Sequence, residues 1–68
     1  MEWITIDSKR KPPFDEVVLL MFKDDRRAVA MRLESHEYKI LALVKGIITH
    51  SYDGICREKP IAYLRICI

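Results

Sequence analysis

The most regular pattern in the chain is a pair of apolar stretches, Val17–Phe22 and Ala28–Met31, separated by the charged segment 23–27. The first stretch is rich in valine and leucine, the second alternates alanine with valine and methionine, and each is about the length of a β-strand. Since only five residues separate them, the pattern predicts a β-hairpin. This hairpin is the best-defined structural element in the sequence.

A two-residue turn at Asp24 and Asp25 predicts one particular strand register. The first face would contain Val18, Leu20, Val29 and Met31 as core, and the second would set Val17, Leu19 and Met21 opposite Arg32, Ala30 and Ala28. Asp-Asp lacks the glycine that favours a tight two-residue turn, so a longer loop stays open. A change of one residue in loop length would exchange the faces.

Two further β-prone segments lie near the ends of the chain. Trp3–Ile6 alternates and predicts a first strand, followed by a loop over Asp7–Pro13 because its two prolines remove backbone donors. Ile61–Ile68 predicts a last strand, with Tyr52–Pro60 before it as turn and loop. That last strand would expose apolar atoms unless it lies inside the sheet or against a partner.

Residues 36–45 allow two interpretations. One is a short helix with Ser35 as N-cap and Gly46 just beyond its end. The other is a strand that turns at Lys45–Gly46 into Ile47–His50, and we favour it because so short a helix has little stability of its own. The sequence thus predicts one mainly β domain over residues 1–68, an antiparallel sheet of five or six strands built on hairpins. A short helix at 36–45, giving an α+β domain, is the alternative.

Composition adds an expectation about surfaces. Half of the 68 residues are apolar, 32% are charged and the net charge is +2. A domain of this size buries only about 60% of the surface of its unfolded chain, so part of the apolar content should face a partner or a second copy. We expect that contact at the apolar strand face or at the C-terminal edge. The small net charge does not by itself indicate nucleic acid.

Cysteine usage and hydropathy predict a cytoplasmic protein. Cys56 and Cys67 do not make the disulfide framework of a small secreted domain. The opening Met1–Ile4 lacks a basic segment followed by an apolar one, so no signal peptide is expected. The run 40–48 is interrupted by Lys45 and is shorter than the roughly 20 residues that cross a bilayer, so no membrane partner is expected.

No constellation of residues predicts catalysis or a cofactor. Cys56 and His50 are close enough in sequence to meet, but no third residue orients them, so we expect no enzyme. His36, His50 and the two cysteines lack zinc-site spacing. Gly46 and Gly54 are the only glycines, which excludes a glycine-rich phosphate loop.

The binding candidates are aromatic and charged residues. Trp3 is either a core residue or an interface anchor, because tryptophan is enriched in binding hot spots. The basic loop 9–11 and the hairpin tip 24–27 supply the charges. The full set is Trp3, Lys9, Arg10, Lys11, Asp24, Arg26, Arg27, Tyr52, Arg57 and Tyr63.

The first third of the chain resembles a family of small domains of unassigned function found in phages, prophages and bacterial genomes. The resemblance lies in the opening Trp3-Ile4-Thr5-Ile6-Asp7, the loop Pro12-Pro13 and the strand Val17–Leu20. The family's closing Thr-His-Trp-x-Pro-Leu-Pro segment is absent, and Ala62–Ile66 stands in its place. The resemblance implies a mobile-element context, in which short proteins bind and disable or redirect a host component.

These observations together predict a non-enzymatic protein-binding module, an inhibitor or adaptor that occludes a host or mobile-element protein. Homo-oligomerisation is expected with it. The alternative is a nucleic-acid or nucleotide binder that uses the basic loop 9–11 and the hairpin tip 24–27, with Tyr38 or Tyr52 for stacking.

Overall fold

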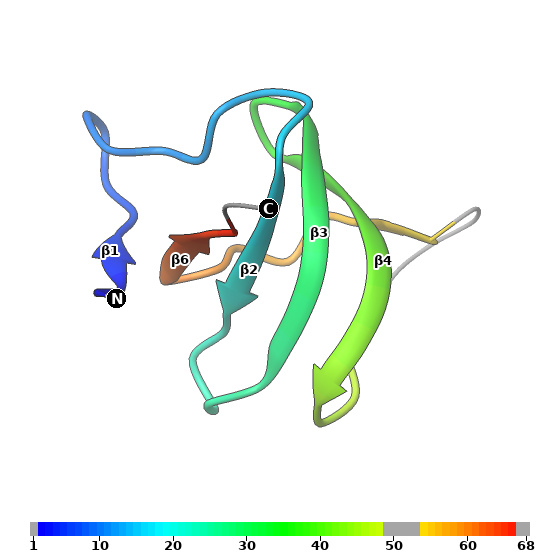
Figure 1. Cartoon of the computed structure of the whole chain (residues 1–68). Helices are drawn as coiled ribbons and strands as arrows, with labels where there is room; N and C mark the ends of the chain where they lie inside the picture. Colours follow the sequence, from blue (N-terminus) through cyan, green and yellow to red (C-terminus); the bar gives the residue numbers. More distant parts are fainter. Residues whose placement is uncertain (1, 49–53, 67–68) are drawn as a thin grey trace.

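The chain forms a single antiparallel sheet in a computed structural model, which describes residues 2–48 and 54–66 (Figure 1). Within these residues the strands are β1 Ile4–Thr5, β2 Val17–Met21, β3 Arg27–Glu34, β4 Glu37–Lys45, β5 Ile55–Cys56 and β6 Ala62–Arg65. Their order in the sheet is β1-β6-β2-β3-β4-β5. The prediction of a mainly β domain with a small antiparallel sheet is confirmed.

The segment 36–45 is a strand, so the alternative of a short helix is wrong. Tyr38 is buried and pairs with Arg32 of β3 on one side and with Cys56 of β5 on the other. This burial and pairing outweigh the helix capping signals at either end of the segment. The polar residues Ser35 and His36 form the tight connection between β3 and β4.

The strand expected after Gly46 does not form at Ile47 and Ile48. Ile48 is buried in the core without belonging to a strand, and the outer partner of β4 is β5, which the sequence indicated as loop. An isoleucine can be buried in an irregular segment as well as in a strand. The apolar pattern at Ile47 and Ile48 therefore could not distinguish a strand from a buried irregular segment. Thr49, His50 and Tyr52 lie outside the described residues.

The hairpin of β2 and β3 has the longer of the two possible turns. The amide of Phe22 donates to the carbonyl of Arg26 (2.8 Å), and the amide of Asp25 donates to the carbonyl of Phe22 (3.0 Å). Asp25 has φ 63°, a left-handed conformation that aspartate tolerates better than most residues. This is a three-residue loop, a β-turn followed by one left-handed residue. The expected two-residue turn is wrong.

The extra loop residue shifts the register by one position and exchanges the faces of β3. Leu20 now lies opposite Ala28, Val18 opposite Ala30, and Leu19 opposite Val29. The inner face therefore carries the alanines, whose small side chains leave room for the large side chains of β2. The buried core consists of Val18, Leu20, Phe22, Ala28, Ala30, Tyr38, Ile48, Cys56 and Tyr63.

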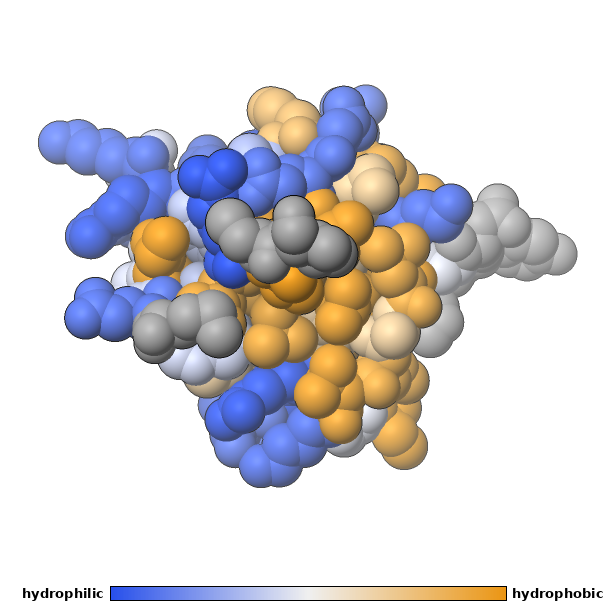
Figure 2. All heavy atoms as spheres, viewed as in Figure 1, coloured by the Kyte–Doolittle hydropathy of each residue, from blue (hydrophilic) through white to orange (hydrophobic). Residues whose placement is uncertain are grey.

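Large apolar side chains consequently gather on the outer face. Its members on β2 and β3 are half-buried: Val17, Leu19, Met21, Val29 and Met31. The sequence assigned Val29 and Met31 to the core and the alanines to this face, so the outer face is more apolar than expected. Figure 2 shows apolar atoms spread over the part of the surface formed by β2, β3 and β4.

Arg32 closes one end of the inner face. It is buried, and its Nη1 donates to the carbonyl of Pro12 (2.8 Å) while its guanidinium lies 4.1 Å from the centre of the Phe14 ring. The sequence placed Arg32 on the outer face, and the register shift moves it inward. The contacts tie the loop between β1 and β2 to the middle of the sheet.

The last strand is an interior strand. β6 lies between β1 and β2, with Tyr63 paired to Ile4 on one side and to Leu20 on the other. The expected C-terminal edge is therefore absent over Ala62 and Tyr63, because both edges of that segment are occupied. The sheet's own hydrogen bonds protect the segment, and no partner is needed there.

Gly46 permits the close contact that holds the hairpin tip against the chain beyond β4. It has φ +79°, and a Cβ at this position would lie 2.6 Å from Cγ of Arg26. Gly54 has a similar φ of +75°, but its Cβ would meet only a carbonyl oxygen of Ile40 at 3.6 Å. The two glycines thus share the same backbone requirement and differ in the space around them.

We expect Gly46→Ala to destabilise the fold by about 3 kcal/mol and Gly54→Ala by about 1 kcal/mol, measured by urea denaturation. Both variants incur the cost of a left-handed non-glycine residue, and only Gly46→Ala must also displace a packed arginine stem. Equal losses in the two variants would contradict the close contact at Gly46.

Candidate binding surfaces

The basic loop 9–11 is organised by Asp7. Its Oδ1 accepts hydrogen bonds from the amides of Lys9 (2.8 Å) and Arg10 (2.7 Å), and the Arg10 guanidinium donates to Oδ2 (3.3 Å). These bonds, the two backbone ones foremost, lower the pKa of the Asp7 carboxyl. The loop is therefore an aspartate-anchored turn in which Arg10 is paired internally, and Lys9 and Lys11 carry its free charge.

Arg26 faces the protein rather than a ligand. Its guanidinium donates to both carboxylate oxygens of Glu58 and to the carbonyl of Ile47 (3.1 Å), and it lies 5.7 Å from the centre of the Phe22 ring. Its ion pair with Asp24 is longer, at 3.6 Å. The hydrogen bonds to Glu58 raise the pKa of Arg26. Arg26 thus joins the hairpin tip to the loop before β6.

Trp3 and Arg27 contact each other. The Arg27 guanidinium lies 5.7 Å from the centre of the half-buried Trp3 ring and donates to Asp25 (2.9 Å). Asp25 also accepts a hydrogen bond from Lys45 at the end of β4 (2.6 Å). The hydrogen bonds from Lys45 and Arg27 lower the pKa of the Asp25 carboxyl. The aromatic and basic candidates at this end of the molecule are engaged with one another.

The remaining predicted residues do not join these groups. Arg57 is exposed and its Nε donates to Glu37 of β4 (2.9 Å). Tyr63 is only 7% exposed and belongs to the core. Tyr52 lies outside the described residues. The structure therefore divides the predicted set into separate clusters, most of whose cations are already paired with carboxylates.

Exposed apolar residues concentrate on the distal half of β4. Between Ala30 and Val29 the register of β4 skips Leu41, and between Ala28 and Arg27 it skips Val44, so both are bulge residues. A bulge bends its strand and redirects the extra side chain. Leu41 is 46% exposed and Val44 57%. The sequence reasoning missed this surface because residue patterning does not reveal bulges.

We name the residues Leu41, Leu43, Val44 and Ile47 the β4 apolar segment. All four are exposed, Ile47 most of all at 82%. β5 pairs with β4 only at Tyr38 and Lys39, so among the described residues the outer edge of β4 has no strand partner from Ile40 onward.

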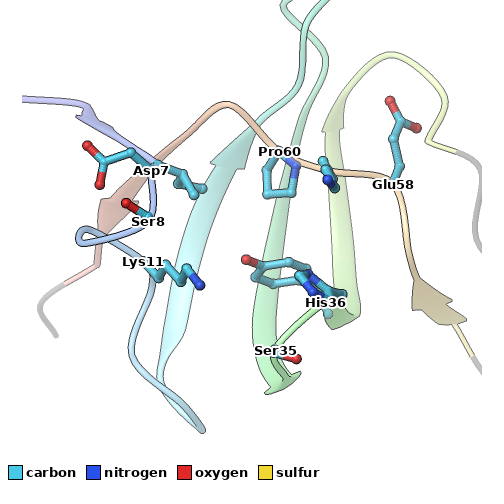
Figure 3. Close-up of a pocket in the computed structure, with 10 residues that line it drawn as sticks. Asp7, Ser8, Lys11, Ser35, His36, Glu58 and Pro60 are labelled. Atoms are coloured by element: carbon cyan, nitrogen blue, oxygen red, sulfur yellow. The ribbon is translucent and has the colours of Figure 1, made fainter.

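A pocket lies on another part of the surface. It has a volume of about 250 Å³ and lies between the loop after β1, the β3–β4 connection and the loop before β6 (Figure 3). Lys11 and His36 line it from two of these segments and Lys59 from the third. Patterning did not indicate this site, because the three segments are far apart in sequence.

The thiol of Cys56 is not poised for nucleophilic chemistry. Cys56 is buried, and burial raises its pKa, which favours the neutral thiol over the reactive thiolate. His50, which the sequence places near enough to meet it, is outside the described residues. Among residues 2–48 and 54–66, no group of three histidine, cysteine or carboxylate side chains is placed to hold a metal ion. The same residues contain no helix long and apolar enough to cross a membrane.

Comparison of the chain with protein-family models, with curated proteins and with solved structures finds no match.

The ion pairs of Asp25 predict a specific acid sensitivity. Because its folded-state pKa is lowered, the ionised carboxylate stabilises the fold above about pH 4, and that contribution is lost as the pH falls further. We expect Asp25→Asn to reduce the fall in melting temperature between pH 7 and pH 3. Asparagine keeps the left-handed turn.

Asp15→Asn is the matched control. Asp15 also has a left-handed backbone, with φ 58°, and its carboxylate forms no ion pair with the described residues. Asp15→Asn should retain the full fall in melting temperature on acidification. If both variants behave alike, the pairing of Asp25 with Lys45 and Arg27 is not the cause.

Proposed function

We propose that the protein is a non-enzymatic protein-binding module that docks through the β4 apolar segment. Four large exposed aliphatic side chains within seven residues are the observation that carries this proposal. Scattered exposed aliphatic residues are normal, whereas a concentrated group marks an interaction surface. The half-buried outer face of β2 and β3 is a second apolar surface available to a partner.

The form of β4 favours docking through side chains over addition of a strand. An open sheet edge invites strand pairing, but the bulges at Leu41 and Val44 interrupt the regular backbone ladder. Lys39 and Lys45 add charge along the same strand. These features oppose strand addition and leave the aliphatic side chains accessible. A partner with an apolar surface therefore fits this part of the molecule best.

The partner in this proposal is a host or mobile-element protein in the cytoplasm. The resemblance of the first third of the chain to phage and prophage domains supports an inhibitor or adaptor, which acts by covering the partner's surface. A chain of 68 residues is large enough to occlude a site. Self-association through the same segment would satisfy the apolar surface when the partner is absent.

The ion pairs of the arginines give less support to the alternative of a nucleic-acid binder than to a protein-binding module. Arg10, Arg26 and Arg27 each have a carboxylate partner, so they offer little unpaired charge to a polyphosphate. We expect neutralisation of loop 9–11 to leave any complex with the protein partner intact.

The test compares the wild-type chain with Leu41→Thr/Val44→Thr. Threonine preserves β-propensity while removing apolar surface, so the variant should fold normally. Light scattering and quantitative capture from a host lysate should show self-association and a stoichiometric partner for the wild type. We expect both to weaken at least tenfold in the variant.

Ile61→Thr is the matched control, because Ile61 is 46% exposed, as Leu41 is, and lies outside the β4 apolar segment. It should behave as the wild type. A monomeric wild-type protein that captures nothing would contradict the proposal. So would undiminished association of Leu41→Thr/Val44→Thr.

A further inference from the structure

The pocket beside the β3–β4 connection combines polar groups from three separate segments. Its acidic and basic lining residues are Asp7, Lys11, His36, Glu58 and Lys59. Two lysines and a histidine stand against two carboxylates, so the formal charges nearly balance. The orientation of these groups decides which charge a ligand would meet.

Both carboxylates of the pocket wall are engaged elsewhere. Asp7 accepts hydrogen bonds from Lys9 and Arg10, and Glu58 uses both oxygens on Arg26. In Figure 3 the carboxylates of Asp7 and Glu58 point away from the space between Lys11 and His36. Both carboxylates therefore already have hydrogen-bond donors within the protein, and neither points into the pocket.

The cationic and donor groups are unengaged. Among the described residues, Lys11, His36 and Lys59 have no side-chain hydrogen bond or ion pair. In Figure 3 the ammonium group of Lys11 extends toward His36. The pocket thus presents to a ligand the charges of two lysines and the imidazole of a histidine, from three backbone segments.

Tyr38 adds a hydroxyl donor at the same place. The residue is only 5% exposed, yet it lines the pocket and its hydroxyl has no hydrogen-bond partner among the described residues. Burial raises the pKa of Tyr38, so the hydroxyl keeps its proton at neutral pH. Because Tyr38 lines the pocket, an acceptor bound there could take a hydrogen bond from this hydroxyl.

We propose that this pocket binds the phosphate group of a small phosphomonoester. Lys11 and Lys59 supply the charge, His36 and the Tyr38 hydroxyl donate hydrogen bonds, and Ser8 and Ser35 lie close by. Ile6, Pro60 and the Tyr38 ring form the apolar wall for the organic part of the ester. This proposal does not depend on the β4 apolar segment.

The donor set favours phosphate over carboxylate. Planar carboxylates are best recognised by the fork of an arginine, and no arginine lines the pocket. Lysine binds phosphate as a point charge, and single donors arriving from several directions suit a tetrahedral anion. The volume of about 250 Å³ lies just below that of sites for drug-sized ligands, so the ligand is small.

The experiment titrates the full chain with phenyl phosphate, benzoate and inorganic phosphate at low ionic strength. Calorimetry gives the affinity, and NMR shifts locate the site. We expect phenyl phosphate to bind at least tenfold more tightly than benzoate, which has the same ring. Shifts should appear at His36 and Tyr38, with inorganic phosphate moving the same signals.

Lys11→Gln and Lys59→Gln should each weaken phenyl phosphate about tenfold. Lys9→Gln is the matched control, because Lys9 is exposed on the same loop but does not line the pocket. Tyr38→Phe keeps the ring and removes the hydroxyl, and we expect a smaller loss of about threefold. Its melting temperature and NMR spectrum establish that it is folded.

Three outcomes would overturn the phosphate pocket: no binding of phenyl phosphate, benzoate binding as tightly, or equal losses in Lys9→Gln and Lys11→Gln. Leu41→Thr/Val44→Thr should bind phenyl phosphate as the wild type does. Failure of the pocket and failure of the protein-binding surface are therefore separate results.

Discussion

The arrangement of both surfaces depends on one turn. Lys23, Asp24 and Asp25 form a three-residue loop that ends in a left-handed aspartate, and this loop length sets the register of β2 against β3. Side chains alternate along a strand, so a shift of one residue would move every side chain of β3 to the other face. The turn thus decides that the alanines face the core and that Val29 and Met31 face outward.

Two further features determine the surfaces beside this hairpin: the bulges of β4 and the contacts of Arg26. The bulges at Leu41 and Val44 interrupt the register of β4, and both side chains are exposed. Arg26 donates hydrogen bonds to Glu58 and so connects the turn to the loop before β6. The absence of a side chain at Gly46 leaves room for the Arg26 stem. The ion pair with Arg26 turns the Glu58 carboxylate away from the pocket beside the β3–β4 connection. The outer face and this pocket are therefore both linked to the hairpin tip, through different contacts.

Patterning predicted the strands better than their pairing. Alternation and β-propensity identified the hairpin, the strand over 36–45 and the last strand. They could not identify the loop length at Asp24–Asp25, because two or three loop residues are both compatible with the same flanking pattern. The sequence identified the basic residues as binding candidates. It did not indicate that Arg26 would form an ion pair with Glu58, or Arg27 with Asp25. The pocket depends on three distant segments, which no local pattern records.

The register of the β2–β3 hairpin is the claim on which the account depends most. Because the amide of Phe22 donates to Arg26, alternate pairs along the ladder are hydrogen-bonded, and Leu19 with Val29 falls between them. Such pairs bring their Cα atoms to about 4.5 Å, close enough for a strong Hα–Hα NMR contact. We expect this contact between Leu19 and Val29. A contact between Leu20 and Val29 instead would contradict the register and the apolar outer face that follows from it.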